Sequence, residues 1–183
     1  TYIEEKAIQT VSDMWERPAL EEVGSLLYGK VHEYPAHECY VNTTRNYSMK
    51  YLGTENPLFL VYEAMPEESG GTPDAISITA SNTIDMGCEI KCPVNPVYHF
   101  RRLRWKDQFD VKENYPLVYT QIQHLLLITR AQEWHFVSFD DRQRYKPAKI
   151  KIIIVKPDKK FQDNLHVRLE MAVKEKYKLI SNH

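Results

Sequence analysis

The chain has 183 residues, a formal net charge of −1 and 43% hydrophobic residues, which suits one domain with a real core. The balanced charge excludes a global basic field, so any contact with nucleic acid must come from a local patch. Three cysteines and no C-x-x-C motif argue against a disulfide framework. No run of about eighteen apolar residues predicts a membrane span. We expect a single domain over residues 1–183, with an N-terminal helical region over 1–50 and a catalytic core over 51–183.

Periodicity predicts both helices and strands along the chain. The expected helices cover residues 2–15, 55–65, 96–109, 119–130 and 161–180. The expected strands cover residues 74–79, 86–91, 133–139 and 149–155, with a turn over 81–85 between the first two. Residues 28–48 are polar and rich in Tyr and His, which indicates short irregular strands. Together these elements predict an α/β fold with a mixed sheet flanked by helices.

Two acids and a lysine form the most informative chemical pattern. Asp74 follows the turn-rich run 70–73, and Glu89 and Lys91 flank Ile90 at the end of a predicted strand. Residues two apart on a strand share a face, so Glu89 and Lys91 lie together while Ile90 is buried on the other side. If a hairpin brings Asp74 back to this strand, two carboxylates can hold Mg²⁺ and the lysine can position a water. The same spacing also suits an exposed hairpin with Glu and Lys on its wet face.

A local basic patch follows the acid–lysine strand. Arg101, Arg102, Arg104 and Lys106 lie within the helix predicted over 96–109. Such a patch can contact the phosphates of DNA. It also suits the solvated face of an ordinary helix.

Four segments match one family pattern in order and spacing. They are Thr72-Pro73-Asp74-Ala75, Cys88-Glu89-Ile90-Lys91-Cys92-Pro93, Tyr119-Thr120-Gln121-Ile122-Gln123-His124 and Trp134-His135-Phe136-Val137-Ser138-Phe139-Asp140. From Gly53 onward the chain resembles the lambda exonuclease (YqaJ-like) family of viral recombination nucleases, within the PD-(D/E)xK superfamily. The resemblance implies a restriction-endonuclease-like core.

The resemblance also implies a two-metal nuclease site. Asp74, Glu89 and the Ile90 carbonyl are the implied ligands of two Mg²⁺ ions, for which Mn²⁺ substitutes. Lys91 is implied to orient the attacking water, and Gln121 to lie on a helix that faces the site.

One departure from the family pattern concerns a further ligand. The family carries a glutamate on its first core helix in a Gly-x-x-x-Glu arrangement. The fourth position after Gly53 is Pro57, and the nearest acid is Glu55. Either Glu55 takes the place of this metal ligand, which makes it our candidate, or the ligand is lost in this chain.

By this resemblance, the expected activity is Mg²⁺-dependent digestion of one strand of linear duplex DNA, 5′ to 3′, leaving a 3′ single strand for recombination. A homotrimer that encircles DNA and a single-strand annealing protein are the implied partners. The implied location is the cytoplasm of a bacterial host of a phage or prophage, or the nucleus for a eukaryotic virus. Two alternatives stay open: a structure- or site-specific endonuclease on the same core, and a degenerate DNA-binding module without activity.

Overall fold

The computed structural model describes residues 24–53 and 57–181. Its helices are α2 (Gly24–Thr44), α3 (Pro96–Arg102), α4 (Gln108–Asn114), α5 (Pro116–Thr129) and α6 (Lys159–Ser181), with a 3₁₀ turn, η1, at Lys146–Lys149. Its strands are β1 (Lys50–Tyr51), β2 (Leu60–Val61), β3 (Gly70–Gly71), β4 (Ala75–Ile78), β5 (Ile84–Lys91), β6 (Glu133–Phe139) and β7 (Ile150–Val155). No helix in the described part of the chain is long and apolar enough to cross a membrane.

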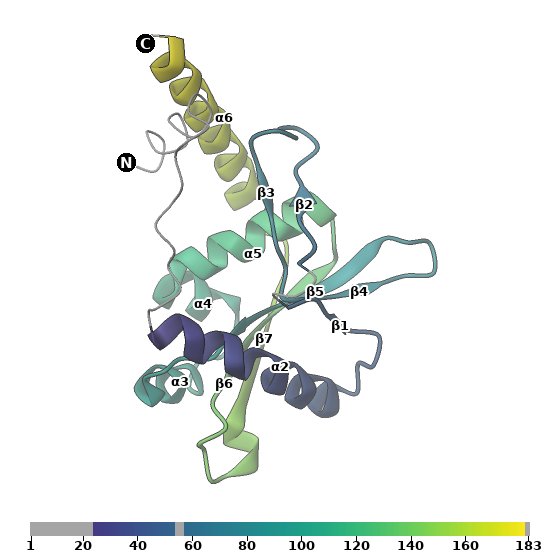
Figure 1. Cartoon of the computed structure of the whole chain (residues 1–183), viewed down its shortest axis with the longest axis vertical. Helices are drawn as coiled ribbons and strands as arrows, with labels where there is room; N and C mark the ends of the chain where they lie inside the picture. The colour runs from purple at the N-terminus through teal and green to yellow at the C-terminus, as the bar shows by residue number, and fades with distance from the viewer. Residues whose placement is uncertain (1–23, 54–56, 182–183) are drawn as a thin grey trace.

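A mixed sheet of five strands, in the order β1-β4-β5-β6-β7, forms the centre of the molecule (Figure 1). Strands β4 and β5 form an antiparallel hairpin, and β6 then adds to β5 in parallel. This parallel step requires a long crossover, which α3, α4 and α5 supply. Strand β7 forms the edge of the sheet and pairs antiparallel with β6. The mixed sheet flanked by helices, predicted from the sequence, is confirmed.

Helices cover both faces of the sheet, and each face has its own hydrophobic core. On one face α5 packs over a core built around Ile122, Trp134 and Phe136. On the other face α2 packs Ala36 and Tyr40 against alternate residues of β5. At the first core Gly87 leaves room for the Trp134 ring, because a Cβ at this position would lie 2.2 Å from the indole. Both faces of β5 are therefore buried, which decides how deep its charged residues lie.

The prediction of short strands over residues 28–48 is wrong, because α2 runs from Gly24 to Thr44. This segment lacks an apolar stripe of helical period and contains Pro35. The helix instead derives its stability from tertiary packing, through Ala36 and Tyr40, which are fully buried one turn apart.

The helix predicted over 55–65 is also wrong over its described part. Leu60 and Val61 form β2, which pairs with Gly70 and Gly71 of β3. A Cβ on Gly70 would lie 2.5 Å from the Leu60 carbonyl oxygen, so the close approach of the two strands requires glycine. The pairing across this small sheet overrides the helical pattern of the sequence.

The single helix predicted over 96–109 is two helices. Helix α3 ends at Arg102, and α4 begins at Gln108. Asp107 caps the second helix: its side chain accepts from the Phe109 N–H, and Asp110 bonds back to the Asp107 backbone. This capping box starts a new helix, so the four basic residues do not lie on one continuous helix. The helix predicted over 2–15 lies outside the described residues.

Candidate active site

Asp74 stands at the start of β4, where the hairpin brings it to the end of β5. Ala75 pairs with Cys88, and Asp74, one residue before it, lies beside the end of β5. The Ile90 N–H donates to Asp74 Oδ2 at 2.6 Å, and the Leu52 N–H donates to the Asp74 carbonyl at 3.0 Å. Backbone from two neighbouring segments therefore fixes the position of this carboxylate.

Glu89 and Lys91 lie on the same side of β5, and Ile90 is buried on the opposite side against α2. Glu89 is fully buried, and its Oε1 pairs closely with the Lys91 ammonium. Its other oxygen, Oε2, is buried and has no hydrogen-bond partner among the residues that the structure describes. This geometry excludes the exposed hairpin, because a carboxylate on a wet face would be solvated.

A third carboxylate, which the sequence analysis missed, comes from α2. Glu33 accepts a hydrogen bond of 3.1 Å from the Tyr51 hydroxyl. It lies close enough to Asp74 and Lys91 for their charges to shift its pKa. We call Glu33, Asp74 and Glu89 the acidic corner. The signal that could have found Glu33 is the Gly-x-x-x-Glu arrangement itself, since Glu33 stands four residues after Gly29. The structure places this arrangement on a helix that packs on the core, whereas Glu55 lies outside the described residues.

Burial raises the pKa values of all three carboxyls, and repulsion from Asp74 adds to this effect at Glu33 and Glu89. Burial, and then the Asp74 charge, raise the pKa of Glu89 to about 8 and that of Glu33 to about 7. Burial raises the pKa of Asp74 against the opposing effect of the Lys91 charge. Burial would lower the pKa of Lys91, but the Glu89 and Asp74 charges raise it above its usual range. Three carboxylates thus face one ammonium, and further positive charge would favour their ionised forms.

The acidic corner fits a hard divalent cation. Carboxylate oxygens are the ligands that Mg²⁺ prefers, and Glu89 Oε2 accepts no hydrogen bond from the described part of the chain. Within residues 24–53 and 57–181 no three His, Cys, Asp or Glu side chains converge tightly enough to enclose an ion. Mg²⁺ usually keeps several of its waters when a protein binds it, so it does not require an enclosing set of protein ligands.

The two glutamines of α5 have different surroundings. Gln121 is exposed, and the described residues offer it no hydrogen bond. Gln123 is fully buried: it donates to the Lys156 carbonyl at 2.9 Å and accepts from the Asp158 N–H at 2.9 Å. Gln123 therefore holds the junction of β7 and α6 in place. The role of Gln121 beside the metals stays a prediction.

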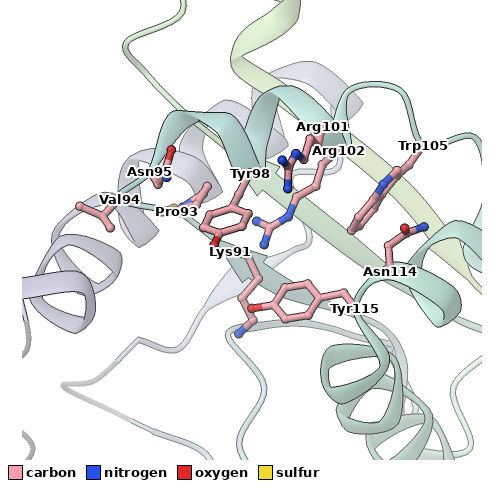
Figure 2. A pocket seen from close by; sticks show the side chains of 11 residues that line it. Lys91, Pro93, Val94, Asn95, Tyr98, Arg101, Arg102, Trp105, Asn114 and Tyr115 are labelled. Carbon is pink, nitrogen blue, oxygen red and sulfur yellow. The ribbon is translucent and has the colours of Figure 1, made fainter.

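A cavity of about 490 Å³ opens beside Lys91, between the end of β5 and helices α3 and α4 (Figure 2). We call it the aromatic cavity. Its lining residues are Lys91, Cys92, Pro93, Val94, Asn95, Tyr98, Arg101, Arg102, Trp105, Asn114 and Tyr115. None of these described residues carries a carboxylate, in contrast to the adjoining acidic corner.

The basic patch predicted from the sequence is divided by the fold. Arg102 is 8% exposed, and its guanidinium lies over the Tyr115 ring at 4.8 Å. Arg101 is exposed at the edge of the aromatic cavity. Arg104 is exposed over the Phe100 ring, and Lys106 is exposed in the turn before α4. Only Arg101 and Arg102 line the cavity, so the four residues do not form one DNA-facing stripe.

A chain of buried polar groups fixes the position of the Arg102 guanidinium. The guanidinium donates to Ser138 Oγ at 3.4 Å, and that hydroxyl also bonds His99 Nδ1 at 2.9 Å. His99 is fully buried, and its Nε2 lies 2.7 Å from the Ala148 carbonyl. Because a carbonyl only accepts, Nε2 carries the proton and Nδ1 accepts from Ser138. The chain of bonds leaves the Ser138 oxygen to accept from Arg102.

The loop that follows Lys91 is also fixed. Arg142 donates to the carbonyls of Pro93 at 3.1 Å and Val94 at 2.9 Å. Its Nε donates to Asp140 Oδ1 at 2.7 Å, where β6 ends. The same guanidinium lies 5.1 Å from the Tyr28 ring on α2, the helix that carries Glu33. One arginine therefore joins the end of β6, the wall of the aromatic cavity and α2.

The fold of this chain matches solved structures, although its sequence matches no family model. No protein-family model matches the chain, and no curated protein matches it significantly. The alkaline exonuclease LHK-Exo from Laribacter hongkongensis matches with a TM-score of 0.76 at 20% identity, over 99% of this chain and 80% of that one. A phage-related exonuclease from Haemophilus somnus 129PT matches with a TM-score of 0.71 at 16% identity, over 99% of this chain and 82% of that one. The chain has the fold of these exonucleases. The restriction-endonuclease-like core expected from the sequence is therefore confirmed.

Proposed function

We propose that this protein is a divalent-metal-dependent nuclease that hydrolyses phosphodiester bonds of DNA. The observation that carries the proposal is the state of Glu89. It is fully buried, one oxygen pairs with Lys91, and the other has no hydrogen-bond partner within residues 24–53 and 57–181. Burying an ionised carboxylate is costly unless it is paired or binds a metal. The Lys91 pairing offsets part of this cost, and a cation bound at the second oxygen would offset the rest.

The residues of the site would divide the work as follows. Asp74, Glu89, Glu33 and the Ile90 carbonyl would hold two Mg²⁺ or Mn²⁺ ions, the number that the sequence resemblance implies. The bound cations would activate water and stabilise the leaving oxygen. The Lys91 ammonium, held by Glu89 at the edge of the aromatic cavity, would orient the attacking water and offset charge that develops on the phosphate. Gln121 would face the metal ions from α5.

We further propose exonuclease action on duplex ends, 5′ to 3′, in DNA recombination. The support is the sequence resemblance together with the matched solved structures, which are named as an alkaline and a phage-related exonuclease. LHK-Exo has also been solved in complex with dAMP, and that structure matches this chain with a TM-score of 0.72 at 19% identity. A homotrimer and a single-strand annealing partner belong to the same proposal and rest on the sequence resemblance.

Linear and covalently closed duplex DNA, each with Mg²⁺ or with EDTA, test the proposal. An exonuclease digests the linear substrate only in Mg²⁺ and leaves the closed circle intact. Labels at the 5′ and 3′ ends give the polarity, and the 5′ label should be released first. Cutting of the circle would replace the exonuclease by an endonuclease. Digestion of neither substrate would contradict the nuclease proposal.

A further inference from the structure

The aromatic cavity combines three kinds of group beside Lys91. Tyr98, Trp105 and Tyr115 supply aromatic rings, Arg101 and Arg102 supply positive charge, and Asn114 supplies an amide. Figure 2 shows Tyr98, Arg102 and Tyr115 directed into the space beside Lys91. Its volume of about 490 Å³ lies within the range of small-molecule sites.

The Tyr98 side chain has no role in stabilising the fold among the described residues. It is 52% exposed, although it lines the cavity, and no aromatic stack or hydrogen bond to its side chain occurs among the described residues. Tyr115, by contrast, packs edge-on against Phe136 and under the Arg102 guanidinium. Trp105 packs against Phe136 with ring centroids 5.6 Å apart. The cavity therefore has a fixed wall of Trp105, Arg102 and Tyr115 and one free ring at its mouth.

A nucleobase is the ligand that these groups suit. Every base presents a π-face that can stack on an aromatic side chain, whatever its sequence. The cavity has no described carboxylate to repel a sugar-phosphate, and its guanidinium groups can attract one. An acidic ligand without a ring would use only the guanidinium groups, and a purely apolar ligand would use only the aromatic rings.

We propose that the aromatic cavity holds the base of the terminal nucleotide, stacked on Tyr98, while its phosphodiester lies at Lys91 and the acidic corner. This inference rests on the proposed nuclease function for the identity of the nucleotide, but not for the binding itself. Because stacking is tolerant of sequence, the cavity would accept all four bases with similar affinity. It would thus place a nucleotide for cleavage without selecting among sequences.

Calorimetry in EDTA tests the base site without metal and without cleavage. The probes are dAMP and 2-deoxyribose 5-phosphate, which has the sugar and phosphate but no base. We expect dAMP to bind about tenfold more tightly, the order of one stacked base. Equal affinity for the two probes, or no binding of dAMP at millimolar concentration, would overturn the proposal.

Variants of Tyr98 locate the effect. Tyr98→Ala should remove most of the preference for dAMP, and Tyr98→Phe should retain it because the ring remains. Tyr145→Ala is the matched control, since Tyr145 is 72% exposed and does not line the cavity. If Tyr98→Ala weakens both probes equally, or neither, the stacking assignment is wrong. The linear-DNA assay is separate: loss of the nuclease function there, with base-dependent binding retained here, would reject only the nuclease proposal.

Discussion

The acidic corner and the aromatic cavity adjoin each other and share Lys91, yet their chemistry is opposite. The corner gathers the carboxylates of Glu33, Asp74 and Glu89 around a single ammonium. The cavity gathers guanidinium groups and aromatic rings, with no carboxylate from the described residues. A corner of this kind attracts cations, and a cavity of this kind attracts nucleotides. The difference supports the proposal that one strand end presents a metal site and a substrate site within the reach of one lysine.

Removing the shared lysine should have the largest effect. Lys91→Ala should lower DNA cleavage by at least about 100-fold, because a positioned charge in the transition state is lost. DNA binding, measured by gel shift in Ca²⁺, should change little. Lys174→Ala on the exposed surface of α6 is the control. Because the substitution leaves Glu89 buried without its partner, thermal melting must show that the variant is folded. Unchanged cleavage by a folded Lys91→Ala protein would remove Lys91 from the site.

Neutralising the third carboxylate tests how far the acidic corner extends. Glu33→Gln should lower cleavage by about 10- to 100-fold and raise the Mg²⁺ concentration needed for half-maximal rate. Glu38→Gln, an exposed position on the same helix, should leave both quantities unchanged. If the two variants behave alike, the corner consists of Asp74 and Glu89 alone.

The exposed arginine of the aromatic cavity should have a smaller effect. Arg101→Gln should weaken DNA binding several-fold and reduce the slope of log affinity against log salt by about one, as for one lost phosphate contact. Arg168→Gln, exposed on α6, should keep the wild-type slope. A salt slope unaltered by Arg101→Gln would place the DNA backbone elsewhere.

The smallest expected effect is on the pH dependence of the melting temperature in the absence of metal. Glu33 and Glu89 have raised pKa values of about 7 and about 8 in the folded protein, so the folded state holds protons that the unfolded state releases. Their contribution to stability is present at low pH and is lost as pH rises from about 5 through 8. In EDTA the melting temperature of the wild type should therefore fall over this range more steeply than that of Glu89→Gln. Mg²⁺ should raise it most at the alkaline end, where the ligands are ionised. Parallel pH profiles for the two proteins would show that Glu89 does not titrate in this window.

The convergence of Asp74, Glu89 and Lys91 could be predicted from the sequence because its signals are local. Asp74 follows a turn, and Glu89 and Lys91 alternate with Ile90 on a strand, so their placement on one side follows from strand geometry. Glu33 was missed because its helix has no apolar periodicity and contains Pro35, and only packing against the sheet makes it a helix.

The burial of Arg102 could not be predicted from the sequence either. An arginine in a basic run reads as a surface residue, since arginine is rarely buried. Its inward position depends on the end of α3 and on Ser138 and Tyr115, which are remote in sequence. Local pattern therefore predicted the strand-borne residues, and long-range packing decided the others.

The most direct test of the central claim measures nucleotide release from linear duplex DNA by the wild type and by Glu89→Gln at the same Mg²⁺ concentration. The acidic corner as a metal site predicts Mg²⁺-dependent release by the wild type and almost none by Glu89→Gln, with the variant still folded and still binding DNA. Release that persists in EDTA, or is undiminished in Glu89→Gln, would contradict it.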